Sequence, residues 1–438
     1  MVIRENYLKK MIDAKDTDFI KVVTGVRRSG KSTLLLMFRD YLLNNGISEN
    51  NIIHMNFESG LYDEINDYKK LYNYVKDKIN KKKMYLLLDE IQNVDKWEKA
   101  INSFKVDFDI DIYITGSNAY LLSSEYSTYL SGRCVEIKML PLSFGEFLDF
   151  HGFEVRESKS ALGGVRKAAY DKAGEKYELR EVFDAYMRFG GMPGIADVGL
   201  DQERALSLLD GIYATVIVRD ILEREKRRDQ KSITDAMLLR KIVMFLADNI
   251  GSTISIASIG NTLVNEGLLA DGRRKGTPST HTVQTYVNAL LESYFFYEIK
   301  RFDIKGKEFL RTLGKYYIVD LGLRNYLLGF RNRDSGHGLE NVVYFELLRR
   351  GYDVAIGKID NMEVDFIATS ADEKIYIQVT ETMTSEEVRK RELKPLEKIR
   401  DNYEKIVLSL EPGLDSTYEG IKSVNVIEWL LNDNGNRK

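Results

Sequence analysis

One eight-residue segment limits what this chain can fold into. Residues 25–32 read Gly-Val-Arg-Arg-Ser-Gly-Lys-Ser, after a short apolar run at residues 19–24 and before an expected helix that begins at Lys31. A glycine at each end lets the backbone curl around phosphate oxygens with its N–H groups pointing inward. In this setting Lys31 supplies a charge for the β- and γ-phosphates, and Ser32 offers a hydroxyl to Mg²⁺. The sequence therefore predicts a phosphate-binding loop (P-loop) between a strand and a helix.

The whole P-loop is expected to contact the nucleotide. Of its two arginines, one is expected to face the phosphates and the other to pack outside. The predicted nucleotide-binding residues are Gly25, Val26, Arg27, Arg28, Ser29, Gly30, Lys31, Ser32 and Thr33. The guanine-reading motif Asn-Lys-x-Asp does not follow the loop, and this favours ATP over GTP.

A pair of carboxylates ends a second apolar run, Tyr85-Leu-Leu-Leu-Asp89-Glu90. At the tip of a neighbouring strand, Asp89 would hold Mg²⁺ through water, and Glu90 would orient or deprotonate the attacking water. The alternative is a buried strand that merely ends in acids. The upstream P-loop favours the catalytic interpretation.

Short polar side chains and one arginine complete the predicted site. The run Ile112-Tyr-Ile-Thr115-Gly-Ser-Asn118 places Ser117 or Asn118 where either could sense the γ-phosphate, although an ordinary capped turn has the same pattern. Arg133 is a candidate arginine finger that would offset charge on the transferred phosphoryl group. A surface or salt-bridge role for Arg133 is the alternative.

The chain alternates between strand and helix patterns, and this predicts an α/β fold with a parallel sheet. We expect a P-loop ATPase domain at 1–150, and a connector and helical region at 151–235, in which residues 152–178 look like a surface insertion. Three helices and a hairpin at 236–330 predict a winged helix-turn-helix. A small α/β unit follows at 338–431. The strands expected in the first domain are residues 19–24, 52–57, 84–88 and 110–115.

Composition limits the setting in which the chain works. The formal net charge is −3, so contact with nucleic acid would need a local basic patch. Cys134 is the only cysteine, and the N-terminus has no apolar run typical of a signal peptide. No run approaches the roughly 18 consecutive apolar residues of a membrane span. We expect a cytoplasmic protein without membrane contact, which could form a homo-oligomer.

The order of motifs resembles a known family. The P-loop, Leu-Leu-Leu-Asp-Glu-Ile-Gln, Thr-Gly-Ser-Asn, Leu-Ser-Gly-Arg, Pro141-Leu-Ser-Phe-Gly-Glu-Phe147 and Phe189-Gly-Gly-Met-Pro-Gly194 occur in this order. Together they resemble the bacterial and archaeal AAA-type ATPases that carry a conserved C-terminal domain of unknown function. The resemblance implies ATP binding, ATPase activity, a winged helix, and a C-terminal domain similar to the restriction-endonuclease fold.

The winged-helix region carries a local basic patch. Residues 300–315 contain six basic and two acidic side chains. The resulting local net charge of +4 lies where a wing would contact phosphates. The expected recognition helix begins with the sequence Ser279-Thr-His-Thr. The expected DNA contacts are Lys300, Arg301, Lys305, Lys307 and Arg311. The alternative is that this module only packs against other domains.

The C-terminal unit has the layout of a degenerate nuclease. Glu340 lies on a leading helix, Asp365 on one strand and Gln378 on the next, where carboxylates would hold Mg²⁺. The lysine expected two residues after Gln378 is replaced by Thr380. We therefore expect binding or packing here rather than cleavage.

The favoured function is a Mg²⁺-dependent ATPase that acts as a conformational switch on or near DNA. One alternative is an ATP-sensing regulatory or scaffold protein with negligible turnover. The other is an ATP-regulated nuclease.

Overall fold

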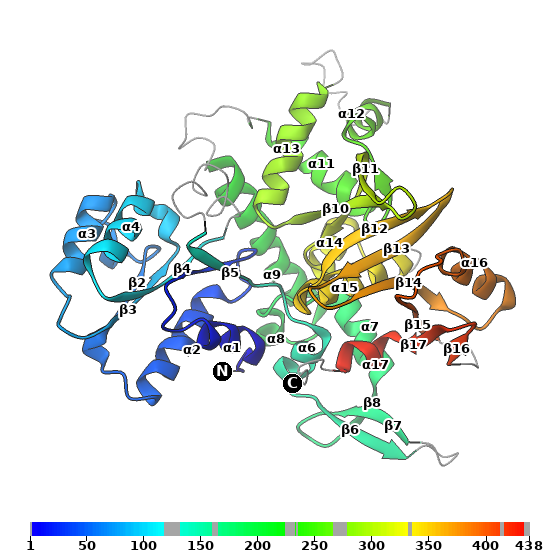
Figure 1. The fold of residues 1–438 in the computed structure, drawn as a ribbon, viewed down its shortest axis with the longest axis horizontal. Helices are drawn as coiled ribbons and strands as arrows, with labels where there is room; N and C mark the ends of the chain where they lie inside the picture. The colour runs from blue at the N-terminus through cyan, green and yellow to red at the C-terminus, as the bar shows by residue number, and fades with distance from the viewer. Residues whose placement is uncertain are drawn as a thin grey trace. The chain divides into compact units, whose positions relative to one another are not determined.

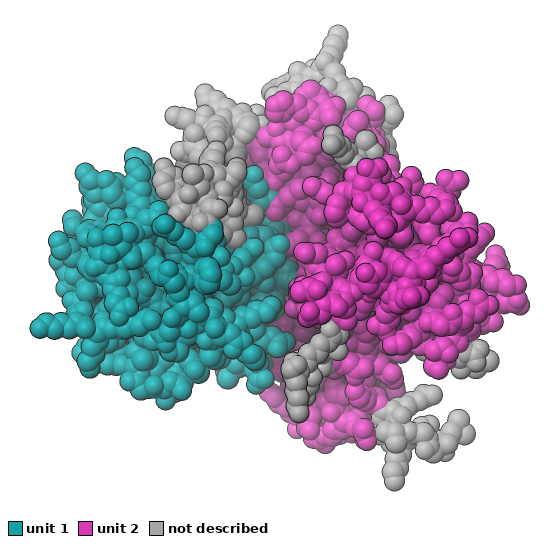
Figure 2. All heavy atoms as spheres, in the orientation of Figure 1, with its two compact units in different colours: residues 1–140, 292–294 teal, residues 141–291, 295–438 magenta. Residues whose placement is uncertain are grey.

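The computed structural model describes residues 2–117, 132–159, 165–223, 233, 235–265, 278–331, 335–411 and 416–432. The chain divides into two compact units, which Figure 2 distinguishes by colour. Unit 1 comprises residues 1–140 with 292–294, and unit 2 comprises residues 141–291 with 295–438. The first boundary lies ten residues before the end of the predicted ATPase domain.

Unit 1 contains a five-stranded parallel sheet in the order β2-β3-β4-β1-β5 (Figure 1). This confirms the predicted α/β class with a parallel sheet. The strands are β1 (Ile20–Thr24), β2 (Ile52–Asn56), β3 (Met84–Asp89), β4 (Ile110–Thr115) and β5 (Cys134–Lys138). The helices are α1 (Glu5–Asp13), α2 (Lys31–Asn44), α3 (Tyr68–Lys76) and α4 (Trp97–Asp107), with short 3-10 turns η1 (Glu49–Asn51), η2 (Gly60–Tyr62) and η3 (Ile91–Asn93).

Both faces of this sheet are covered by helices, which explains why its central strands β1, β3 and β4 are buried along their whole length. Alternate residues of a strand point to opposite faces. Val22 packs with α3 and α4 residues in one core cluster, whereas Val23 packs with α1 and α2 residues in another. Leu86 and Leu87 divide between the two clusters in the same way.

Unit 2 begins with helices and a small sheet. Helices were predicted for this region, whereas the sheet was not. The segment 152–178, predicted as a polar insertion, forms the antiparallel sheet β6-β7-β8. Ser143 and Glu146 form a reciprocal capping box at the start of α6. These elements are α6 (Phe144–His151), β6 (Glu154–Lys159), β7 (Val165–Tyr170), β8 (Lys176–Glu178), α7 (Leu179–Phe189), α8 (Ile195–Val198), α9 (Gln202–Ala214) and the π-helix η5 (Thr215–Glu223).

The rest of unit 2 is built on a nine-stranded sheet in the order β16-β17-β15-β14-β13-β12-β10-β11-β9. Its strands are β9 (Thr253–Ile254), β10 (Phe296–Asp303), β11 (Glu308–Ile318), β12 (Asp353–Ile359), β13 (Met362–Thr369), β14 (Lys374–Thr382), β15 (Glu404–Glu411), β16 (Thr417–Tyr418) and β17 (Ile421–Asn425). Its helices are α11 (Ala236–Asp248), α12 (Ile256–Asn265), α13 (Thr280–Glu292), α14 (Leu321–Leu328), α15 (Ser335–Arg349), α16 (Glu386–Glu397) and α17 (Val426–Leu431). Across the described ranges, no helix has both the length and the apolarity needed to cross a bilayer.

The hairpin β10–β11 differs from the short wing that the sequence predicted. Both strands extend beyond their predicted ranges, 295–299 and 316–319, and residues Arg301–Asp303 of β10 pair in parallel with residues 356–358 of β12. The ranges 236–330 and 338–431, predicted as separate modules, therefore share one sheet. Pairing satisfies backbone groups that an isolated hairpin would leave exposed at its edge.

A buried carboxylate fixes the break in the predicted helical region at Gly190. Asp320 caps α14, where it accepts a hydrogen bond from Leu323 N (3.1 Å), and it also accepts one from Gly191 N (2.6 Å). Gly190 has φ 79°, and a Cβ there would clash with the Asp320 carboxylate. Burial raises the pKa of Asp320 to about 6, although backbone N–H donors oppose the shift. Asp320 thus joins the Gly-Gly turn to α14.

We expect Asp320→Asn to lower the free energy of unfolding by about 1–3 kcal/mol, because the new NH₂ would face backbone N–H donors. The raised pKa means that the folded state binds the proton more tightly between about pH 4 and pH 6. Wild-type stability should therefore fall as pH rises through this window, by at most about 3 kcal/mol from this group. The deficit of the variant should be larger at pH 4.5 than at pH 7.5. Urea unfolding at both values, with exposed Asp372→Asn as control, measures this; an equal deficit at both would contradict it.

Candidate nucleotide-binding site

The P-loop has the geometry that its glycines predict. Gly25 has φ 139° and Gly30 has φ 100°, conformations that residues with a Cβ rarely adopt. A Cβ on Gly25 would also clash with the carbonyl oxygen of Met139. Gly30 is the N-cap of α2, so the loop opens onto a helix N-terminus. Helix N-termini favour anions through free N–H groups and the helix dipole.

Lys31 lies inside the curl of the loop and is almost fully buried. Its Nζ donates to Gly25 O (3.0 Å) and Val26 O (3.2 Å), and it lies 3.9 Å from Glu90 Oε1. These contacts place the ammonium group between the loop and the acid pair at the end of β3. A phosphate in the loop would contact this cation directly.

The two carboxylate oxygens of Asp89 differ in their hydrogen bonding. Its Oδ1 accepts the hydroxyl of Thr115, whereas its buried Oδ2 has no partner among the described residues. A buried, unsatisfied oxygen is costly, and one near a phosphate loop fits an acceptor for a Mg²⁺-bound water. Ser32, in the first turn of α2, is the second residue that fits the ion.

Glu90 stands at a strained turn directly after β3. It has φ 53°, a left-handed conformation, and its side chain is largely buried. Its N–H donates to Thr115 Oγ1 (3.0 Å), and its Oε2 accepts the amide of Gln92. Thr115 therefore bonds to both acidic residues, a role that no sequence motif indicates.

The remaining loop residues differ in exposure. Arg27 pairs with Glu58, and Arg28 is exposed with φ 64°. The Oγ of Ser29 is buried and has no hydrogen-bond partner among the described residues, and Thr33 is half-buried.

Arg133 does not lie at the P-loop of its own chain. It comes directly before β5, and its carbonyl accepts Ile20 N (2.8 Å), at the start of β1. Because β1 and β5 are parallel, Arg133 lies at the amino edge of the sheet, about 16 Å along β1 from the P-loop. This position separates Arg133 from the P-loop of its own subunit. Asn118 lies outside the described residues, whereas Ser117 is buried two residues after the end of β4.

Arg4 is a site residue that no sequence pattern indicated. Its buried guanidinium donates from one nitrogen to Ser29 O (3.1 Å) and Leu140 O (2.9 Å), and it lies 4.5 Å from the ring centre of Tyr7. The N-terminal helix thereby supports the P-loop from outside. Arg4 is more than twenty residues from the loop in sequence, so local spacing gives no signal for it.

The three nuclease-like residues of unit 2 already bond to other protein groups. Glu340 Oε2 accepts from Tyr317 OH (2.9 Å) and Lys315 Nζ (3.2 Å), and Asp365 Oδ2 accepts from Val379 N (2.8 Å). The Gln378 oxygen accepts from Asp365 N (2.8 Å). Burial and the charge of Glu340 raise the pKa of Asp365. In the part of the chain that the structure describes, no group of three or more His, Cys, Asp or Glu residues is placed to hold a metal.

A lysine does occupy this cluster, although not at Thr380. Lys315 on β11 is buried, and its Nζ lies 2.7 Å from Glu363 Oε1 and 3.2 Å from Glu340 Oε2. Burial lowers the pKa of Lys315, but the carboxylates of Glu340, Asp365 and Glu363 raise it more, and the net shift is upward. Its charge therefore compensates the acids from inside the protein.

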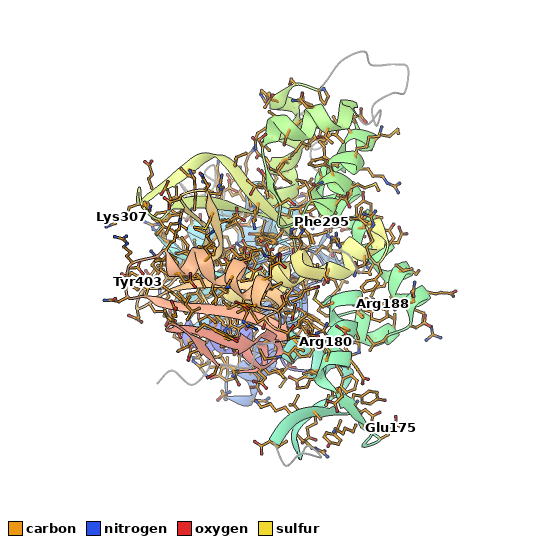
Figure 3. The ribbon with its side chains drawn as sticks, turned by 90° about the vertical axis from the view of Figure 1, so that its right-hand side faces the viewer. Glu175, Arg180, Arg188, Phe295, Lys307 and Tyr403 are labelled. Atoms are coloured by element: carbon orange, nitrogen blue, oxygen red, sulfur yellow. The ribbon has the colours of Figure 1, made fainter. Side chains whose placement is uncertain are left out.

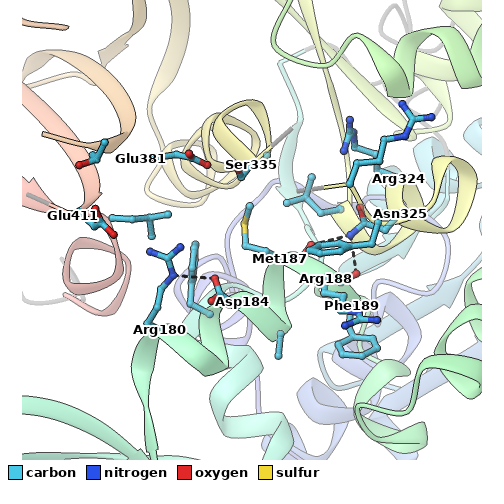
Figure 4. A pocket seen from close by; sticks show the side chains of 18 residues that line it. Arg180, Asp184, Met187, Arg188, Phe189, Arg324, Asn325, Ser335, Glu381 and Glu411 are labelled. Atoms are coloured by element: carbon cyan, nitrogen blue, oxygen red, sulfur yellow. Dashed lines mark hydrogen bonds and ion pairs between the residues drawn. The ribbon is translucent and has the colours of Figure 1, made fainter. Parts of the chain in front are cut away.

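A cavity of about 700 Å³ lies elsewhere in unit 2, between α7, α14 and α15 (Figure 4). Arginines line it, and each has a partner. Arg180 pairs with Asp184, Arg188 with Gln202, and Arg331 with Asp248, while Arg324 donates to Ala247 O. Arg180 and Arg331 thus bond to carboxylates, whereas Arg188 and Arg324 bond to neutral oxygens.

Comparison with known proteins agrees with this geometry. The model of a family described as "AAA domain" matches residues 17–148, and a domain of unknown function, DUF8612, matches residues 180–334. An "Uncharacterized protein" of Haemophilus influenzae is 41% identical over 433 residues, covering 98% of this chain and 99% of that protein. One from Methanocaldococcus jannaschii is 33% identical over 391 residues, covering 86% and 78%.

Among solved structures, the Walker-type ATPase of Pyrococcus abyssi aligns with a TM-score of 0.47 and 14% identity, covering 75% of this chain and 96% of that one. The resemblance inferred from the motifs is confirmed by the family match and by the two relatives. The chain belongs to a family of AAA-type P-loop ATPases that is present in both bacteria and archaea.

Proposed function

We propose that this protein binds ATP with Mg²⁺ at residues 25–33, hydrolyses it, and uses the cycle as a conformational switch on or near DNA. The observation that carries the hydrolytic part is the buried Oδ2 of Asp89, which has no hydrogen-bond partner among the described residues and lies at the same sheet edge as Lys31. Parallel α/β sheets bind ligands at the carboxyl ends of their strands. β1, β3 and β4 all end at this edge.

Each residue has a distinct role in this proposal. The loop N–H groups and Lys31 bind the phosphates, Ser32 and Asp89 hold Mg²⁺, and Glu90 activates water. When bound, Mg²⁺ offsets charge that develops on the phosphoryl group. Asn118 would sense the γ-phosphate. Arg133 could act only in a neighbouring subunit's site, which would require a homo-oligomer.

The DNA part of the proposal concerns residues 236–330. The order α11, β9, α12, α13, β10, β11, with β9 paired to β11, supports a winged helix. Lys300 and Lys307 are exposed, and Figure 3 marks Lys307 at the outer part of the hairpin. Lys305 instead pairs with Asp360, and Arg301 is half-buried. The side chain of Arg311 lies outside the described part of the chain.

The rate of ATP hydrolysis distinguishes the proposed switch from an ATP-sensing scaffold protein. ATP hydrolysis should be measured with no DNA, with single-stranded DNA and with duplex DNA. A rate that DNA changes supports the switch. Tight ATP binding with negligible turnover under all three conditions would favour the scaffold.

We propose that unit 2 does not cleave DNA. The order of Glu340, Asp365 and Gln378 along its sheet resembles that of a restriction endonuclease. Lys315 and the hydrogen bonds of Asp365 and Gln378 support the absence of cleavage, because they occupy the groups that a metal would need. We expect no cleavage of linear, circular or single-stranded DNA with Mg²⁺ or Mn²⁺. Cleavage that Asp365→Ala abolishes and Lys31→Ala retains would establish the nuclease alternative.

We expect Lys31→Ala to abolish detectable ATP binding or hydrolysis, because the cation inside the loop is lost. Binding of a fluorescent ATP analogue and phosphate release measure the two steps. Exposed Lys69→Ala on α3 is the matched control and should retain both. A folded Lys31→Ala variant with normal turnover would contradict the assignment of the site.

We expect Glu90→Gln to keep ATP binding but to slow hydrolysis by about 10²–10⁴-fold, because the amide keeps the shape without acting as a base. Single-turnover phosphate release measures the chemical step. Exposed Glu64→Gln serves as control. If Glu90→Gln and Asp89→Asn both turn over normally, the strand is structural and the chemistry takes place elsewhere.

A further inference from the structure

We infer that α13 is a base-reading helix for the DNA major groove, with a preference for A·T pairs. The inference rests on the proposed association with DNA and goes beyond it, since association alone needs only basic residues. It names the residues that would discriminate one duplex from another. It also names the base that they would select.

The helix has one anchored face and one exposed face. Val283, Tyr286, Val287 and Leu290 are buried. The hydroxyl of Tyr286 accepts a hydrogen bond from Asp235 N (3.0 Å), the N-cap residue of α11. In Figure 1, α13 lies beside α11 and α12. The anchored face therefore holds α13 as a rigid element, as recognition of base edges requires.

The opposite face carries uncharged hydrogen-bonding groups. His281, Gln284, Thr285 and Asn288 are exposed or half-buried at positions i, i+3, i+4 and i+7, which form one stripe on a helix. Apart from His281, α13 has no ionisable side chain on this stripe, and its one carboxylate is Glu292 at the end. A helix face that is only solvated is usually charged, as on α16, whose sequence is EEVRKRELKPLE.

The two amides of the stripe are already oriented. Gln284 Nε2 donates to Asn288 Oδ1 (2.8 Å), which leaves the oxygen of Gln284 as an acceptor and the NH₂ of Asn288 as a donor. Adenine presents a donor at N6 and an acceptor at N7 in the major groove. Thr285 donates to His281 O (3.0 Å), and its methyl group could contact that of thymine. This complementarity favours A·T pairs over G·C pairs.

The same unit supplies cations for the phosphate backbone. Exposed Lys300 and Lys307 lie on the hairpin β10–β11, whose strand β11 pairs with β9 between α11 and α12. In winged helices the hairpin flanks the helix that enters the groove. The charged hairpin would bind any duplex, and the neutral stripe of α13 would select among duplexes.

The test selects bound sequences from a random duplex pool with the full-length protein, and then measures affinities by fluorescence anisotropy. We expect enriched sites with A·T pairs. The double variant Gln284→Ala, Asn288→Ala should lose about 10- to 100-fold of its affinity for these sites while its affinity for unrelated duplexes stays unchanged. Asn402→Ala, an exposed amide before β15, is the matched control.

Two further variants separate this inference from DNA association itself. Lys300→Glu with Lys307→Glu should weaken binding to all duplexes and flatten its salt dependence. Gln284→Glu should shift the preferred base from adenine toward cytosine, because a carboxylate accepts from cytosine N4. Binding without sequence preference would overturn the base-reading inference and leave DNA association intact. No binding to duplex DNA at low salt, or binding to RNA alone, would overturn both.

Discussion

The hydrogen bonds of the Thr115 hydroxyl organise the nucleotide site. This side chain donates to Asp89 and accepts from Glu90 N–H, so it sets both the direction of the first carboxylate and the strained turn at the second. The arrangement is possible because β4 lies between β1 and β3 in the sheet. The P-loop and the acid pair are thereby separated by one strand. Arg4, from the N-terminal helix, supports the loop on its other side.

The two units differ in how their buried carboxylates are compensated. In unit 1, one buried oxygen of Asp89 has no partner within the residues that the structure describes, which suits a site that gains an ion on binding. In unit 2, Glu340, Glu363 and Asp365 surround the buried ammonium of Lys315, so their charge is compensated before any ligand arrives. The contrast gives a physical reason to place chemistry in the first unit. The second unit is then better suited to positioning or recognition.

Much of the first unit could be predicted because its strands are buried on both faces. The apolar runs at 52–57, 84–88 and 110–115 match β2, β3 and β4 to within one residue at each end. The edge strand β5 was missed, since most of its side chains are not buried and its apolar pattern is weak. The sheet β6-β7-β8 was missed for the same reason, and the pairing of β10 with β12 depends on residues more than fifty positions apart.

The sequence alone determined the site residues that act within one short segment of the chain. Gly25, Gly30 and Lys31 act through a single turn of backbone, and Asp89 and Glu90 follow directly from the end of their strand, so spacing was sufficient to find them. Only the tertiary structure decided which distant residues meet: Thr115 with Asp89, Arg4 with Ser29, Lys315 with Glu340, and Arg133 at the edge away from the P-loop. Strand order and direction set these neighbours. Both depend on how whole helices and strands bury their apolar faces, which no short motif encodes.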